Sequence, residues 1–298
     1  MRLFFLLLLL CAGTTATQAA DLYDATPRTA VISAFEPEWQ LLRTALHDPK
    51  EYTLNGTSFV TGTIEGKPVL LFLSGISMIN AAMTTQFALD HFAIERIVFS
   101  GIAGGADPSL AIGDVVIPSE WSEYLESVFA REEKGTYELP PYAAVTSTHY
   151  GMIFPQPVQI AQGHEPPKKV TWFHVDPALL ETARAVAHTA ALHDCAQQQC
   201  LKHKPRVVVG GNGVSGQAFV DNKAFRQYAR SAFQAEVIDM ESAAVAHVAY
   251  VNAKPFIAFR TLSDLAGGGA GKNEMDTFFQ VAADNAGAVV IAFLEAMH

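Results

Sequence analysis

Three carboxylate side chains in this sequence could perform acid and base chemistry. Glu38 follows the apolar run 29–35, Asp264 follows the apolar run 255–262, and Glu241 stands at the start of a predicted helix. Ligands of open parallel sheets bind at the carboxyl ends of the strands, so these groups could meet in one crevice. Carboxyl groups in unlike surroundings can have separated pKa values and divide acid and base roles. The simpler interpretation of Glu38 and Glu241 is that they begin helices and interact favourably with the helix dipole.

Glycines form a second candidate feature, in the segment 101–105 with the sequence GIAGG. Gly101, Gly104 and Gly105 follow a predicted strand and could cradle a phosphate group. Their spacing matches neither the GxGxxG nor the GxxxxGK[ST] pattern of phosphate-binding loops. The alternative is that the glycines let the chain turn tightly and let a ligand approach the backbone.

Short apolar strands alternate with segments of helical spacing along most of the chain. This order predicts a mostly parallel sheet covered by helices. The predicted strands are 29–35, two strands within 57–73 joined at Glu65-Gly66, 94–100, 206–210 and 255–262, and the predicted helices are 37–46, 79–91, 177–190, 239–250 and 273–297.

The segment 1–20 has the layout of a secretory signal peptide. Arg2 precedes a short apolar run, and small or polar residues ending in alanines follow. The run is too short for a membrane-spanning helix, and an uncleaved anchor is the alternative. Cleavage would leave 21–298 as one domain of a secreted or periplasmic protein. Within it, the loosely patterned region 121–204 is expected to be an elaboration, with a linker between two domains as the alternative.

Two cysteines remain within 21–298, namely Cys195 and Cys200. In an oxidising compartment, two neighbouring cysteines most simply form a local disulfide. His193 and His203 flank the pair and leave a metal site as the alternative, although the spacing matches no zinc pattern. The histidines form no evident ligand cluster, so no metal is expected.

Composition and charge exclude several classes of protein. Half of the 298 residues are hydrophobic, which is enough to bury a core and argues against disorder. The formal net charge of −10 would repel a phosphate backbone, so no nucleic-acid partner is expected. No later apolar run is long enough to span a bilayer, so no membrane association is expected after cleavage.

Four ordered motifs carry a resemblance to a known superfamily. GIAGGADPSLAIGDVVIP (101–118), SGQAFVDN (215–222), VIDMESAAVAHVA (237–249) and FRTLSDLAGG (259–268) resemble the nucleoside phosphorylases and nucleosidases. The functional pattern is most similar to that of 5′-methylthioadenosine/S-adenosylhomocysteine nucleosidases, and VVVGGNGVSGQAFVDN with the cysteine pair is similar to secreted plant bark and vegetative storage proteins. The resemblance implies a three-layer α/β fold with a mixed, mostly parallel central sheet flanked by helices.

The resemblance also implies a role for each candidate side chain. Asp264 would be the general acid that protonates the purine at N7, and Glu38 would position or deprotonate the attacking water. Such groups suit the reaction, because the leaving purine needs a proton and the oxocarbenium-like ribose favours nearby negative charge. The implied binding residues are Ser263 holding the acid, Glu241 on the ribose hydroxyls, Met240 on the sugar, Phe219 stacked on the purine, Val220 at its edge, Phe35 and Ile76 at the 5′ substituent, and Gly104 against the ligand.

The nucleophile distinguishes two activities. Phosphorylases of the superfamily bring arginines to the glycine loops, where they bind phosphate. The corresponding loops of this chain contain no arginine; they are EPE (36–38), SGI (74–76) and SGIAGG (100–105). The Glu38 carboxylate would also repel phosphate. Hydrolysis of a purine nucleoside by an N-ribosyl hydrolase is therefore expected, with phosphorolysis or a non-catalytic nucleoside-binding or storage protein as alternatives. The resemblance further implies a homodimer and no cofactor.

Overall fold

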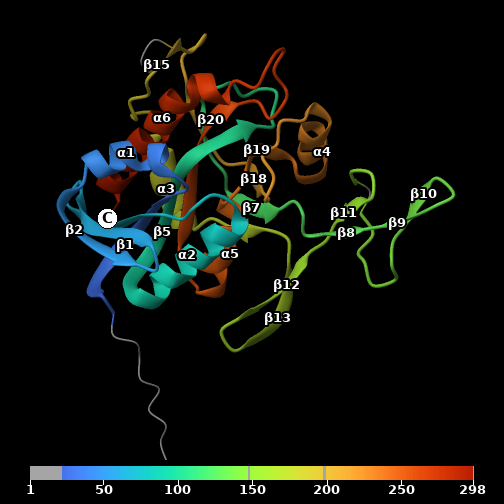
Figure 1. Cartoon of the computed structure of the whole chain (residues 1–298), viewed down its shortest axis with the longest axis horizontal. Helices are drawn as coiled ribbons and strands as arrows, with labels where there is room; N and C mark the ends of the chain where they lie inside the picture. Colours follow the sequence, from blue (N-terminus) through green and yellow to red (C-terminus); the bar gives the residue numbers. More distant parts are fainter. Residues whose placement is uncertain (1–21, 147, 197–198, 298) are drawn as a thin grey trace, which may run out of the picture.

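The structure is a computed structural model that describes residues 22–146, 148–196 and 199–297. The predicted signal peptide, 1–20, lies outside these residues. A twelve-stranded sheet forms the centre of the described chain, with helices packed against it (Figure 1). Its spatial order is β14 (Phe173–His174), β7 (Glu120–Glu123), β18 (Asn212–Ser215), β19 (Ala235–Asp239), β5 (Phe92–Gly105), β1 (Asp24–Ser33), β4 (Lys67–Leu73), β3 (Thr57–Ile64) and β2 (His47–Leu54). Strand β20 (Phe256–Asp264) pairs with β5 and with β6 (Val115–Ile117), which also pairs with β17 (Val207–Val209).

The middle of the sheet is parallel and buried. Strands β4, β1, β5 and β20 run in the same direction, and every residue of β20 is buried. Burial on both faces explains why these strands appear in the sequence as continuous apolar runs. The edge is antiparallel, because β3 and β4 form a hairpin whose turn residues, Glu65 and Gly66, both have positive φ. Such a turn suits the twist of a two-residue hairpin.

Helices cover both faces of the sheet (Figure 1). In one layer, α6 (Met275–Ala296) packs on β20 and β5, and α1 (Glu36–Thr44) and α3 (Pro177–Val186) pack on α6. In the other layer, α2 (Met78–His91) packs beside α5 (Ser242–Val251), while α4 (Lys223–Phe233) lies against β18 and β19. The predicted three-layer α/β fold with a mixed, mostly parallel sheet flanked by helices is confirmed.

Several predicted boundaries are wrong. The helix predicted over 239–250 begins only at Ser242, because Asp239 is the last residue of the short strand β19. The strand predicted over 94–100 continues to Gly105, since β5 runs through the GIAGG segment. Gly101, Gly104 and Gly105 therefore have strand conformation, and the tight-turn interpretation of these glycines does not hold.

Several elements have no counterpart among the predicted ones, and β2, β19 and α4 illustrate the reasons. Strand β2 is polar and mostly exposed at the sheet edge, so it carries no apolar run. Strand β19 is five residues long and lies between two helices. Helix α4 mixes apolar and basic residues and begins at Asn222, whose side chain accepts a hydrogen bond from Phe225 N at 2.9 Å.

The region 121–204 contains α3 and four two-stranded sheets. These pair β8 (Ser127–Phe129) with β11 (Ile153–Pro155), β9 (Arg131–Glu133) with β10 (Thr136–Glu138), β12 (Val158–Gln162) with β13 (Glu165–Val170), and β15 (Cys195–Ala196) with β16 (Gln199–Cys200). The first two pairs project away from the main sheet (Figure 1). Helix α3 ends at Val186, four residues earlier than predicted. Across β15 and β16 the two cysteine sulfurs lie at bonding distance, and no group of three or more His, Cys, Asp or Glu side chains in the described residues is placed to hold a metal ion.

By length and composition, α6 is the one helix of the described residues that could span a membrane. In its most apolar window, 56% of the residues are buried inside the fold. The helix packs against β20, β5 and α1, which is the environment of a core helix.

Candidate active site

A cavity of about 240 Å³ lies where β1, β5, β19 and β20 end. All ten residues for which the sequence predicts a catalytic or binding role line it, namely Phe35, Glu38, Ile76, Gly104, Phe219, Val220, Met240, Glu241, Ser263 and Asp264. The fold thus brings together segments from the first to the last strand of the sheet. Ile102 and Met275 also line the cavity, although the sequence assigns a catalytic or binding role to neither.

Asp264 is the last residue of β20 and is almost completely buried. Its Oδ2 accepts a hydrogen bond from Ser263 Oγ at 3.0 Å, and its Oδ1 accepts one from Ala266 N at 2.8 Å. Burial raises the pKa of Asp264, and this effect outweighs the two hydrogen bonds, which lower it. A carboxyl group with a raised pKa on a cavity wall is better suited to act as a general acid than an exposed one.

Glu38 lies in the first turn of α1 and is also buried. Its Oε2 accepts a hydrogen bond from Ala34 N at 2.7 Å, and its Oε1 accepts one from Ile102 N at 2.8 Å. The side chain therefore bridges the ends of β1 and β5. Burial raises the pKa of Glu38, with Arg260 and the two amides acting in the opposite direction. The raised pKa makes Glu38 a stronger base than an exposed glutamate.

Glu241 occupies the N-cap position of α5, but its side chain makes no capping hydrogen bond. Instead, Asp239 Oδ1 accepts hydrogen bonds from the amides of Glu241 and Ser242, at 3.3 and 3.2 Å. The Glu241 carboxylate turns toward α2, where its Oε1 accepts a hydrogen bond from Ser77 N at 2.7 Å. The interpretation of Glu241 as an ordinary helix cap therefore does not hold, and Asp239 performs that function.

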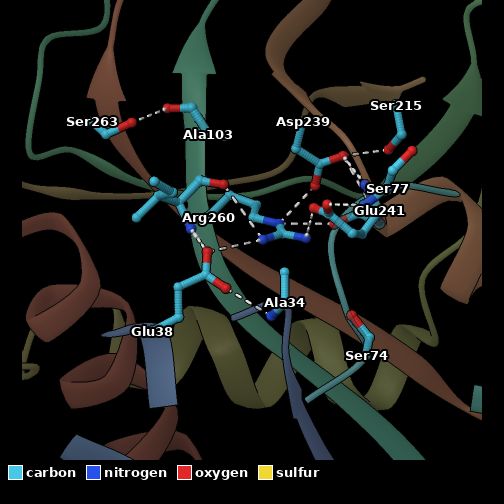
Figure 2. Close-up of polar contacts among 12 residues, drawn as sticks. Ala34, Glu38, Ser74, Ser77, Ala103, Ser215, Asp239, Glu241, Arg260 and Ser263 are labelled. Carbon is cyan, nitrogen blue, oxygen red and sulfur yellow. Dashed lines mark hydrogen bonds and ion pairs between the residues drawn. The ribbon is translucent and has the colours of Figure 1, made fainter. Parts of the chain in front are cut away.

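Arg260 is a site residue that sequence reasoning misses. It lies within the apolar strand β20 and is completely buried behind the cavity wall. Its guanidinium faces three carboxylates (Figure 2). Nε lies 2.7 Å from Asp239 Oδ2, Nη2 lies 3.6 Å from Glu241 Oε2, and Nη1 lies 3.9 Å from Glu38 Oε1. A single arginine in an apolar strand could have been recognised, because arginine is almost never fully buried unless it is paired.

Charge in this cluster is unbalanced, because one cation faces three buried carboxylates. Full ionisation would leave excess negative charge in a poorly solvated place, which favours retention of a proton. Burial, opposed by Arg260 and reinforced by Asp239, raises the pKa of Glu241 to about 8. The guanidinium also lies over the ring of Phe99, 4.1 Å from its centroid.

Glycines of β5 make room for these groups. A Cβ at Gly101 would overlap both Arg260 Nη1 and Glu38 Oε1. A Cβ at Gly104 would lie 3.1 Å from Asp264 Oδ1. The groups that approach the backbone of the GIAGG segment are therefore side chains of the protein itself, and the approach of a ligand stays a prediction.

Apolar side chains form the rest of the cavity wall. Phe219 is 53% exposed and Ile76 is 48% exposed, which places both at the mouth. Phe35 lies deeper and packs against Phe279, with ring centroids 5.4 Å apart. A cavity with an exposed aromatic ring and a few convergent polar groups suits a planar ligand with polar substituents.

The fold and this carboxylate-lined cavity define the chain as a member of the Phosphorylase superfamily, whose pattern it matches over residues 28–295. Among its relatives, the 5′-methylthioadenosine/S-adenosylhomocysteine nucleosidase of Lysinibacillus sphaericus is 31% identical over 267 residues, covering 89% of this chain and 97% of that protein. Bark storage protein B of Populus deltoides is 27% identical over 223 residues, covering 71% of this chain and 70% of that protein.

Solved structures give the same result. The 5′-methylthioadenosine/S-adenosylhomocysteine nucleosidase of Neisseria meningitidis, in complex with methylthio-immucillin-A, matches with a TM-score of 0.68 and 27% identity, covering 91% of this chain and 99% of that one. The predicted superfamily, with its nucleosidase and storage-protein branches, is thereby confirmed. The names of these relatives agree with the prediction of an N-ribosyl hydrolase.

Proposed function

We propose that this protein hydrolyses the N-glycosidic bond of a purine nucleoside of the methylthioadenosine or adenosylhomocysteine type and releases the free base. The observation that carries the proposal is the presence of two buried carboxyl groups with raised pKa values, Asp264 and Glu38, on one cavity. The nucleosidases to which the chain is similar support the same class of reaction.

Asp264 supplies the proton for the leaving group. As the bond from ribose C1′ to purine N9 breaks, its electron pair moves into the purine, and protonation at N7 by Asp264 neutralises the developing charge. Ionised Asp264 is then stabilised by the hydrogen bonds that it accepts from Ser263 Oγ and Ala266 N.

Glu38 accepts the proton of the attacking water. The amides of Ala34 and Ile102 each donate to one of its oxygens and fix the carboxylate, whose remaining lone pairs can bind a water molecule. Its negative charge also stabilises the oxocarbenium-like ribose. Water then attacks C1′ and yields the free sugar.

The remaining lining residues bind the substrate. Glu241 binds the ribose hydroxyls, with Met240 packed on the sugar. Phe219 stacks on the purine, whose edge is read by the backbone of Val220 and whose face lies close to Gly104. Phe35 and Ile76 contact the 5′ substituent.

Water is the proposed nucleophile because the cavity offers phosphate no cation. Among the described residues that line it, the ionisable ones are all acidic: Glu38, Asp239, Glu241 and Asp264. Arg260 is buried and occupied by carboxylates. A phosphate ion would therefore lose its hydration without gaining a compensating partner.

A substrate screen tests this function. The protein is incubated with methylthioadenosine, adenosylhomocysteine, adenosine, inosine and guanosine, with and without phosphate, and free base and ribose 1-phosphate are measured. We expect phosphate-independent release of base, and phosphate-dependent ribose 1-phosphate would identify a phosphorylase instead. Binding of nucleosides without cleavage would favour the storage-protein alternative.

Substitution of the proposed acid makes the test specific. Asp264→Asn should reduce turnover by roughly 10²- to 10⁴-fold, the usual contribution of a general acid. Asp48→Asn is the matched control, because Asp48 is exposed on β2 and asparagine tolerates its φ of 51°. Undiminished turnover by Asp264→Asn would refute the assignment of Asp264.

We further propose how the protein is processed and assembled. Signal cleavage would leave 21–298 as one secreted or periplasmic domain, with 121–204 as its elaboration and a disulfide between Cys195 and Cys200. The chain would form a homodimer through the face of α2 and α5 beside the cavity. Ile79 and Met83 on this face are 64% and 62% exposed, which is unusual for large apolar side chains in a cluster.

A further inference from the structure

The turn from Ser74 to Ser77, between β4 and α2, has a strained end. Ser77 has φ 80° and ψ 158°, a backbone region that is essentially restricted to glycine. Serine is a favoured N-cap residue, and an N-cap serine ordinarily uses its side chain to cap the helix. Ser77 is the N-cap of α2, yet its side chain makes no capping hydrogen bond. Something other than local preference must therefore maintain this conformation.

Side chains hold both polar groups of the peptide unit that joins Ile76 to Ser77. The N–H of Ser77 donates to Glu241 Oε1 at 2.7 Å (Figure 2). The C=O of Ile76 accepts a hydrogen bond from Asn80 Nδ2 at 2.8 Å. Rotation of this peptide plane would relieve the strain at Ser77, but it would break both hydrogen bonds.

The held peptide connects two parts of the cavity. On one side, it orients the Glu241 carboxylate, which faces Arg260 with its other oxygen. On the other side, it fixes Ile76 at the cavity mouth. The same peptide unit therefore sets the positions of both Glu241 and Ile76 on the cavity wall.

We propose that Asn80 is a positioning residue, which holds the Ile76–Ser77 peptide in its strained orientation so that Glu241 and Ile76 face the bound nucleoside. This inference rests on the proposed function. Asn80 does not contact the reacting atoms, so its loss should weaken substrate binding more than it slows the chemical step. Relaxation of the turn would give Ser77 an ordinary N-cap conformation and withdraw its N–H from Glu241.

Asn80→Ala tests the proposal. Asn80 is exposed on α2 and alanine favours helices, so the variant should fold. We expect the KM for methylthioadenosine to rise by roughly three- to tenfold, the range for one lost hydrogen bond, with a smaller change in kcat. Addition of Ser77→Gly should restore most of the KM, because glycine adopts the held conformation without strain. An unaltered KM in Asn80→Ala, or a double variant that keeps the KM of Asn80→Ala, would overturn the proposal.

A glycine placed at another strained residue shows whether rescue of the KM is specific to Ser77. Gln234 also has positive φ, 51°, at the exposed end of α4. Gln234→Gly added to Asn80→Ala should leave the raised KM unchanged, and recovery of KM by Gln234→Gly would refute the positioning role.

Hydrogen exchange of the amides in the peptide 74–78 needs no substrate. Exchange should be faster in Asn80→Ala and slow again with Ser77→Gly, and equal exchange in all three proteins would contradict the proposal. If the wild-type protein cleaves no nucleoside, the proposed function fails while exchange still decides whether the turn is held.

Discussion

Arg260 Nε lies 2.7 Å from Asp239 Oδ2, and both side chains are buried. Asp239 also accepts hydrogen bonds from the Ser215 hydroxyl and from the first amides of α5. The pair therefore ties β20 to the segment that carries Met240 and Glu241. The guanidinium supports the position of the cavity wall as well as its charge.

Arg260→Met should destabilise the fold strongly. It leaves buried carboxylates without their cation, which typically costs about 3–5 kcal/mol in the free energy of unfolding. The measurement is urea denaturation at neutral pH. Arg43→Met is the control, since Arg43 is partly exposed, 3.7 Å from Glu51, and should change stability by about 1 kcal/mol or less. Equal unfolding midpoints for both variants would contradict the role assigned to Arg260.

Ser263→Ala should shift the alkaline limb of the pH profile. Asp264 must be protonated to act as an acid, so kcat/KM should fall as pH rises through its pKa, which burial holds above the ordinary value. The hydroxyl of Ser263 donates to the ionised carboxylate and lowers this pKa. Its removal should therefore move the alkaline limb to higher pH, while the acid limb, which reflects protonation of Glu38, stays in place. A shift to lower pH would show that Ser263 does not stabilise the ionised form.

Glu241→Gln should change how stability depends on pH. The folded state binds the Glu241 proton more tightly than the unfolded state, because its folded pKa is raised to about 8. The stability that this proton contributes is present below the ordinary glutamate pKa and is lost as pH rises through the folded value. Glutamine resembles the protonated form, so the unfolding free energy of Glu241→Gln minus that of the wild type should rise by roughly 4 kcal/mol from about pH 5 to about pH 9. Thermal unfolding across this range checks the slope, and a constant difference would mean that Glu241 does not titrate there.

Met83→Glu should dissociate the proposed homodimer. A charge placed on an apolar interface must be desolvated without a partner, which disfavours association. Sedimentation velocity distinguishes dimer from monomer. Ala185→Glu, at an exposed position of α3 in the opposite helix layer, should leave the oligomeric state unchanged. A monomeric wild-type protein would refute the assembly directly.

Sequence patterns predicted the buried parts of the fold best. The runs VLLFL and FIAFRTL are apolar because their strands are covered on both faces. Such continuous apolar runs can be recognised in the sequence alone. The edge strand β2 is polar and mostly exposed, and β19 is too short to show a period. The end of β5 was missed because glycine, usually a turn residue, is required there by side chains that arrive from β20 and α1.

Strand ends and the family resemblance together led to the predicted site residues. Residues that follow predicted strands, such as Glu38 and Asp264, line the cavity. Arg260 lies inside a strand, and its importance arises from carboxylates that are distant in the sequence. The Ser77 conformation is likewise invisible in the sequence, since serine before a helix predicts an ordinary cap.

The absence of a side chain at Gly101 makes the charge cluster depend on the pairing of β5 with β20. The guanidinium of Arg260 occupies that space only when β5 and β20 pair in register, with Gly101 opposite Arg260. Contacts so distant along the chain form late, and β20 is the last strand to be synthesised. A nascent chain therefore has no assembled charge cluster until β20 has been synthesised.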